Sequence, residues 1–365
     1  MRFVAPAYED VPTVAEMVDV MNRTVTGLET TKLRLALHLR RFMVGAALGR
    51  ERAPQNVLII GPSGGGKTHL VRRLLESIPV MWTEANATEY SDVGYVGREL
   101  TSMYLGLFQP QWRGRRGEET PYTMPEVTAL AEQWGVVVLD EFDKLQADPR
   151  PKQGERAVGR ALQAELLKLS EGTEALVKRN DDDRGVFLNT HHVLHIAMGA
   201  FQGLNRMVGL RDNPEVHPGD IPPNAYMKAT IFDIIKFGFL EELVGRFSTI
   251  VTLPPLDAGH MSRILREHVV PAFVRQCADD GIRLVIEDGA IAAAATRSTG
   301  LPIGARALIP MIDDCLHTSW SKAVRGDTIL LTAAGVMSDS SFLERATGST
   351  GLVSQTLAPT PQAGL

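Results

Sequence analysis

Two short stretches of this sequence combine the residue types that phosphate chemistry requires. The first, GPSGGGKT at residues 61–68, fits the pattern G-x-x-x-x-G-K-[ST] at every fixed position and follows the apolar run 57–60. Glycines let backbone N–H groups converge on phosphate oxygens, and the helix expected next adds its positive end. Lys67 is expected to reach the β- and γ-phosphates, and Thr68 to hold a magnesium ion. The residues expected to cradle the phosphates are Gly61, Pro62, Ser63, Gly64, Gly65, Gly66, Lys67 and Thr68.

The second stretch, GVVVLDE at residues 135–141, is an apolar run that ends in two carboxylates. It is typical of a buried strand of a parallel sheet. Asp140 is expected to hold Mg²⁺ through water, and Glu141 to polarise the attacking water as a general base. The alternatives are a glycine turn that binds nothing and a surface turn with two acids. The strand and helix around GPSGGGKT, and the order of the two stretches, favour ATP hydrolysis with Mg²⁺.

Strands that alternate with helices predict a parallel, doubly wound α/β sheet, in which ligands bind at the carboxyl ends of the strands. The segments 109–122 and 202–230 are expected to be loops, and 178–185 a charged turn. We expect strands at 57–60, 80–88, 135–141, 193–201 and 248–256, and helices at 13–25, 29–48, 69–78, 98–108 and 231–247.

The pair Pro254-Pro255 predicts a domain boundary. Residues 1–254 then form a large ATPase domain with N-terminal helices, and residues 255–346 a small, mainly helical domain. In the small domain the helical patterns are 257–280, 287–298 and 303–324, with a short strand at 327–332. The tail 347–365 is small, polar and proline-rich, which is typical of disorder.

Composition narrows the class of protein. The net charge of −5 argues against a dedicated nucleic-acid surface, and the two cysteines, Cys277 and Cys315, fit a reducing compartment. No signal peptide and no apolar run of about 18 residues is evident, so a cytoplasmic protein is expected. His191, His192 and His195 could suggest a metal site, but in a strand His192 would point away from the other two.

Six motifs in this order resemble the AAA+ protein unfoldases of the ClpX and HslU type, over roughly residues 26–333. The combination of GYVG-R-E with IKFGF-x-E-x-x-GRF is the most specific part of the likeness. The motifs are GPSGGGKT (61–68), NATEYSDVGYVGREL (86–100), VVVLDEFDK (136–144), MGAF (198–201), DIIKFGFLEELVGRF (233–247) and GARAL (304–308).

The resemblance implies a homo-hexameric ring, an AAA+ fold with a small helical lid domain, and ATP bound between the two domains. Val25 and Thr26 would edge the adenine. Arg246 resembles the arginine finger that completes the neighbour's site, and Arg306 the sensor arginine of the small domain. Tyr95 and Val96 resemble the pore loop that grips an unfolded or tagged protein substrate.

The chain also departs from these relatives. With two cysteines it has no counterpart of the four-cysteine zinc domain of ClpX, and segment 202–230 lacks the Ile-Gly-Phe tripeptide that docks a ClpP-type peptidase. Three aspartates replace a basic entrance loop, Met198 ends the sensor strand, and Leu28 stands where the family has Gln. Two alternatives to an unfoldase therefore stay open: a motor that acts on nucleic acid, and a scaffold that binds nucleotide but hydrolyses it weakly.

Overall fold

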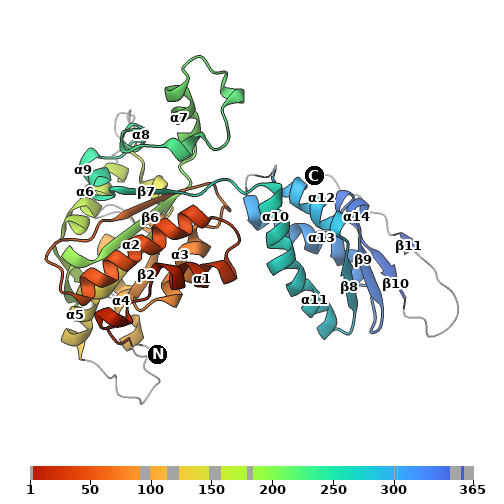
Figure 1. The fold of residues 1–365 in the computed structure, drawn as a ribbon, viewed down its shortest axis with the longest axis horizontal. Helices are drawn as coiled ribbons and strands as arrows, with labels where there is room; N and C mark the ends of the chain where they lie inside the picture. Colours follow the sequence, from red (N-terminus) through yellow and green to blue (C-terminus); the bar gives the residue numbers. More distant parts are fainter. Residues whose placement is uncertain are drawn as a thin grey trace. The chain divides into compact units, whose positions relative to one another are not determined.

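The computed structural model describes residues 3–90, 99–112, 123–147, 158–178, 184–299, 301, 303–345 and 355–356. The chain divides into two compact units (Figure 1). The first comprises Met1–Pro62 and Lys67–Pro254, and the second Ser63–Gly66 and Pro255–Leu365.

A five-stranded parallel sheet forms the centre of the first unit, in the order β2-β3-β6-β1-β7. This confirms the predicted doubly wound α/β sheet. Strand β1 is buried along its whole length, because helices cover both faces of the sheet. The strands are β1 (Val57–Ile60), β2 (Met81–Asn86), β3 (Gly135–Asp140), β6 (Leu194–Gly199) and β7 (Thr249–Thr252).

Alternate strand residues enter two different cores. On one face Ile59 and Met198 pack with α1, α2 and α3, whereas on the other Ile60 and Leu139 pack with α4, α5 and α6. The two-residue period of a strand thus sorts each apolar run between two helical layers. The helices are α1 (Val14–Thr24), α2 (Glu29–Ala47), α3 (Lys67–Ser77), α4 (Leu105–Trp112), α5 (Met124–Trp134) and α6 (Val158–Glu171).

Two predictions about loops were wrong. Residues 109–112 belong to α4, and the supposed loop 202–230 contains helix α7 (Leu204–Asp212) and two short 3₁₀ turns, η6 (Pro218–Asp220) and η7 (Ala225–Lys228). Leu204 and Val208, one helical turn apart, are fully buried and anchor α7. In Figure 1, α7 and the segment after it project away from the parallel sheet.

The predicted helix 231–247 is two helices, α8 (Ile231–Phe237) and α9 (Glu241–Arg246). Gly238 separates them with a φ of +118°, a left-handed conformation that ends α8. A side chain at this position would lie 2.7 Å from the carbonyl oxygen of Ala147, so glycine is required.

Some further helices and strands were not predicted from the sequence, and others are of a different type from the one predicted. Helix α5 and the hairpin of β4 (Glu174–Val177) and β5 (Val186–Asn189) were not predicted. The predicted helix 98–108 begins with a 3₁₀ stretch, η3 (Leu100–Tyr104), before α4. His191 and His192 lie in a 3₁₀ turn, η5 (Thr190–His192), and not in the strand that holds His195.

The second unit packs helices against a four-stranded sheet of order β11-β10-β9-β8, in which only β8 and β9 are parallel. Its helices are α10 (Ala258–Ile264), the π-helical η8 (Leu265–Val269), α11 (Val270–Asp279), α12 (Asp288–Thr299), the 3₁₀ turn η9 (Gly304–Ala307), α13 (Leu308–Trp320) and α14 (Ala333–Met337). Its strands are β8 (Arg283–Ile286), β9 (Thr328–Leu331), β10 (Phe342–Glu344) and β11 (Gln355–Thr356).

The predicted helix 257–280 contains the π turn η8 just before Pro271, whose ring and missing N–H disturb the preceding turn. Cys277 and Cys315 are buried free thiols in this unit, and burial raises the pKa of each to about 11. Across the described part of both units, no helix is long and apolar enough to span a bilayer.

Candidate nucleotide site

The two sequence stretches predicted to act on ATP, 61–68 and 135–141, meet at one edge of the parallel sheet. The hydroxyl of Thr68, in the first turn of α3, donates a hydrogen bond of 2.7 Å to Oδ2 of Asp140 at the end of β3. Strands β1 and β3 flank β6, so their carboxyl ends lie at the same edge. Residues 72 positions apart in sequence are thereby brought into direct contact.

The phosphate loop has the backbone expected of a phosphate cradle. Gly64 and Gly66 have φ values of +68° and +87°, which a residue with a side chain adopts only at a cost. At Gly61 a side chain would lie 2.9 Å from the Cβ of Leu253. Nζ of Lys67 donates to the carbonyl oxygens of Gly61 and Pro62 at 2.8 and 3.0 Å, which keeps the ammonium group over the loop. These residues fit a bound triphosphate.

Glu141 has a left-handed backbone, with a φ of +55°. This conformation is uncommon for a residue other than glycine and often marks a functional turn. Its N–H donates to Oδ1 of Asp140 at 2.8 Å, and its carbonyl oxygen accepts from the N–H of Lys144 at 2.9 Å. The turn leaves the Glu141 side chain exposed directly beside Asp140, where it can reach a water molecule.

Val25 and Thr26, expected to edge the adenine, are buried between α1 and α2. Lys32, which the sequence analysis did not select, holds this segment in place. Its ammonium group is almost fully buried and donates to the carbonyl oxygen of Val25 at 2.5 Å and to Oδ1 of Asn22 at 2.8 Å. The position of Lys32 one turn into α2 is the only sequence signal for this role.

Arg246, the predicted arginine finger, is the last residue of α9. Its guanidinium donates to Oε1 of Glu171 at 2.7 Å, and the two side chains are 46% and 42% exposed. Arg306, the predicted sensor arginine, is an exposed residue of η9 in the second unit. Tyr95 and Val96 lie outside the described residues.

Comparison with known proteins now decides the family. The sequence profile of the AAA domain (Cdc48 subfamily) matches residues 52–250, more than half of the chain. The chain belongs to the AAA family.

Within that family the chain is ClpX-like. It is 29% identical over 351 residues to the ATP-dependent Clp protease ATP-binding subunit ClpX 3 of Methylococcus capsulatus, covering 87% of this chain and 78% of the relative. It is 32% identical over 285 residues to ClpX of Azotobacter vinelandii, with 73% and 62% covered. It is 26% identical over 331 residues to ClpX of Bacteroides thetaiotaomicron, with 84% and 76% covered. A ClpX-like AAA protein is an ATPase, and this chain is one.

Met198 of this ClpX-like chain lies in the core and not in the nucleotide site. Its side chain is fully buried, and its Cα pairs in register with that of Ile59 on β1. The carboxyl end of β6 is instead formed by Gly199, whose carbonyl oxygen accepts from the N–H of Gly61 at 3.3 Å. Met198 therefore contributes to core packing.

The segment where ClpX carries its docking tripeptide folds back on itself in this protein. Asn205 of α7 donates to the carbonyl oxygen of Pro222 and accepts from the N–H of Tyr226, both at 3.0 Å. The hydroxyl of Tyr226 donates to the carbonyl oxygen of Leu253 at 2.6 Å, and Arg211 pairs with Asp233. These contacts hold the described segment against α8 and the end of β7.

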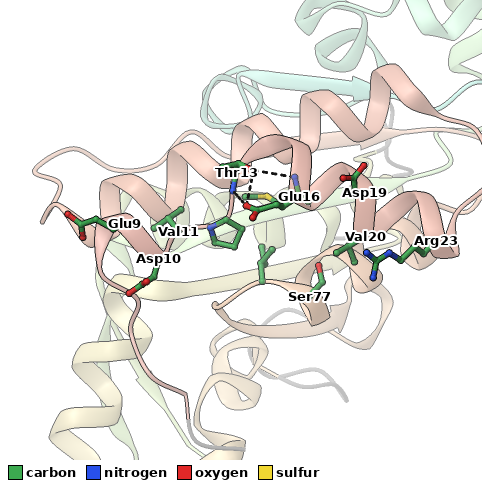
Figure 2. A pocket seen from close by; sticks show the side chains of 12 residues that line it. Glu9, Asp10, Val11, Thr13, Glu16, Asp19, Val20, Arg23 and Ser77 are labelled. Carbon is green, nitrogen blue, oxygen red and sulfur yellow. Dashed lines mark hydrogen bonds between the residues drawn. The ribbon is translucent and has the colours of Figure 1, made fainter.

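A separate cavity of about 590 Å³ lies between the N-terminal segment, α1 and the end of α3 (Figure 2). Four carboxylates line it, and one of them, Glu16, accepts from the N–H and hydroxyl of Thr13 as part of the cap of α1. These two hydrogen bonds lower the pKa of Glu16. The cavity contains none of the residues of the nucleotide site.

Proposed function

We propose that this ATPase works as one subunit of a homo-hexameric ring that unfolds proteins and threads them through its centre. The observation that carries the proposal is the contact of Thr68 with Asp140 beside Glu141, at 2.7 Å between Oγ1 and Oδ2. It supports a site in which a phosphate-binding loop, a metal-binding pair and a general base act together on ATP.

Each residue has a defined role in this proposal. The loop Gly61–Thr68 would hold the phosphates, and Val25 and Thr26 would edge the adenine. Thr68 and Asp140 would hold Mg²⁺, which neutralises phosphate charge when it is bound. Glu141 would accept the proton of the attacking water, because its carboxylate is exposed next to Asp140.

Two arginines would complete the site. Arg246 lies at the exposed end of α9, and in a ring it would neutralise charge on the ATP of the neighbouring subunit. Arg306 would respond to the γ-phosphate bound by its own subunit. An arginine finger supplied by a neighbour makes hydrolysis depend on ring assembly.

Tyr95 and Val96 would grip the protein substrate. An aromatic side chain on a loop flanked by glycines can contact a polypeptide of any sequence. The relatives are named as ATP-binding subunits of Clp protease, which supports a partner peptidase of the ClpP type. Segment 202–230 lacks Ile-Gly-Phe and is folded where described, so a peptidase would have to dock through a different surface.

The first test uses Glu141→Gln, which removes the base but keeps the shape of the side chain. We expect nucleotide binding to persist while hydrolysis falls below about 1% of the wild-type rate. Glu76→Gln is the matched control, because Glu76 is an exposed glutamate of α3 outside the site. Normal turnover in Glu141→Gln would refute the assignment.

The second test separates unfolding from hydrolysis. Tyr95→Ala is expected to hydrolyse ATP at a rate close to wild type and to fail to unfold a tagged fluorescent reporter protein. Stimulation of the wild-type ATPase by unfolded protein supports the proposal. Stimulation by DNA alone would instead assign the chain to the nucleic-acid motors.

A further inference from the structure

Gln163 on α6 joins the turn after Glu141 to helix α9. The side chain is fully buried, and its amide bonds to three backbone groups. Nε2 donates to the carbonyl oxygens of Leu145 and Gly238 at 2.7 and 3.1 Å, and Oε1 accepts from the N–H of Leu240 at 2.7 Å. Buried hydrogen bonds of this kind hold a fixed geometry, because breaking one leaves a polar group without water.

The three backbone groups belong to two segments. One adjoins Glu141, the predicted general base, and the other leads into α9, which ends at Arg246, the predicted arginine finger. Leu145 ends the 3₁₀ turn η4 (Phe142–Leu145), which begins directly after Glu141. Leu240 is the N-cap of α9, which ends at Arg246. The N–H of Ala147 also donates to the carbonyl oxygen of Gly238 at 3.1 Å. Gln163 therefore connects both segments through one rigid amide group.

Aromatic rings make a second connection between the same segments. Phe142 follows Glu141 and Phe247 follows Arg246, and their ring centroids are 5.3 Å apart. Phe142 also stacks on Phe239 at 4.8 Å with an interplanar angle of 21°. All three rings are almost fully buried. A shift of the turn after Glu141 must therefore move or repack the residues at both ends of α9.

Helix α6 contacts both ends of α9. Gln163 binds the N–H of Leu240 before its first turn, and Glu171 binds Arg246 at its last residue. The ion pair of Glu171 with Arg246 is exposed and weak, so Arg246 can leave it. The hydrogen bonds of Gln163 are buried and shielded from water. Buried contacts thus hold the backbone at both ends of α9, and only the exposed side chain of Arg246 is free to move.

We propose that Gln163 is a positioning residue that fixes α9, and with it Arg246, relative to the turn that carries Glu141. In this way the conformation of the turn after Glu141 sets the position of Arg246, which the same subunit presents to the next subunit. The inference rests on the proposed function, in which Arg246 acts on the neighbour's ATP. A misplacement of about 1 Å in such a group can lower a rate about 100-fold.

The test uses Gln163→Met, which keeps the length of the side chain and removes all three hydrogen bonds. In rings made only of Gln163→Met subunits we expect the kcat for ATP hydrolysis to fall 10- to 100-fold, with little change in KM. The variant is then mixed with an excess of Glu141→Gln subunits, which cannot hydrolyse ATP but carry an intact Gln163 and Arg246. Most Gln163→Met sites then receive a correctly placed arginine, so turnover per Gln163→Met subunit should rise several-fold.

Arg246→Ala mixed in the same way is the reference, and Gln133→Met is the control for loss of a glutamine amide that binds a backbone carbonyl. Gln133 of α5 donates to the carbonyl oxygen of Ala46 at 2.6 Å, away from α9, and its replacement should leave turnover unchanged. If Gln163→Met subunits do not fold, Gln163→Glu takes their place, because it keeps the acceptor for Leu240 and loses at least one of the two donors to Leu145 and Gly238.

The outcomes separate the inference from the proposed function. Rescue of both Gln163→Met and Arg246→Ala supports the inference. Rescue of Arg246→Ala alone means that Gln163 acts only on its own site, which overturns the inference and leaves the proposed function intact. If Arg246→Ala is not rescued, Arg246 does not act on a neighbour, and the proposed role of Arg246 is wrong together with the inference.

Discussion

Arg246 donates to Glu171 at 2.7 Å, so the predicted finger of α9 is paired with the last residue of α6. Both side chains are nearly half exposed, and such pairs contribute little to stability. An arginine that acts on another molecule must be released at small cost, and this pair meets that condition. In the proposed function, Glu171 would therefore hold Arg246 near its working position without fixing it there.

Glu171→Gln tests this interpretation. Loss of an exposed pair changes the free energy of unfolding by at most about 1 kcal/mol, and release of Arg246 raises turnover by at most about fivefold. Steady-state ATPase assays and urea unfolding measure the two effects. Glu76→Gln breaks a similarly exposed pair with Arg73, so it should have a similarly small effect on stability and leave turnover unchanged. A tenfold loss of turnover in Glu171→Gln would show that the pair is required for hydrolysis.

Thr68→Ala tests the contact between Thr68 and Asp140. The variant loses the hydroxyl that donates to Asp140, and we expect turnover to fall about 100-fold because the proposed ligand of Mg²⁺ is lost. Titration of the ATPase with Mg²⁺ should show a higher requirement for the ion. Thr68→Ser keeps the hydroxyl and should stay within about fivefold of wild type. Equal rates in the two variants would mean that the hydroxyl has no role.

Lys32→Met tests the buried lysine that holds the Val25 segment. The carbonyl oxygen of Val25 and Oδ1 of Asn22 lose this donor, so we expect a loss of about 1–3 kcal/mol in the free energy of unfolding. Affinity for a fluorescent adenine nucleotide should fall as well, because Val25 is expected to edge the adenine. Arg34→Met removes an exposed charge from the same helix and is the control. Unchanged affinity in a destabilised Lys32→Met would limit the lysine to a structural role.

His195 predicts a pH dependence of stability. It is fully buried on β6, its Nε2 is 2.8 Å from the hydroxyl of Tyr104, and burial lowers its pKa from 6.5 to about 4. Between these values the unfolded chain binds a proton that the folded protein does not. Stability is therefore lost as the pH falls from about 6.5 to about 4, by about 3 kcal/mol in total.

Urea unfolding between about pH 7 and about pH 4.5 measures this loss. His195→Gln should be less sensitive to pH over the same range, and the difference between the two proteins isolates His195. Burial also lowers the pKa values of His38 and His192, which contribute equally to both curves. Parallel curves for the wild type and His195→Gln would contradict the prediction.

Local patterns were sufficient for the strands of the sheet and for the helices with a clear apolar face. The runs at 57–60 and 135–139 are continuous and apolar because both faces of the sheet are covered. Pattern reading was less successful at 202–230, where α7 is short and only Leu204 and Val208 mark its buried side. It also missed the break at Gly238, because residues 231–247 have helical composition on both sides of the glycine.

By itself the sequence determined that this protein binds phosphate, since GPSGGGKT and the Asp140-Glu141 pair are local motifs whose chemistry depends on spacing along the chain. Only the tertiary structure decided what holds these motifs in place. Lys32 donates to Val25, and Gln163 bonds to Leu145 and Leu240. Met198 packs in the core. All of these are contacts between different parts of the fold. Such contacts leave no periodic signal, because they depend on which elements pack together and not on the neighbours of a residue in sequence.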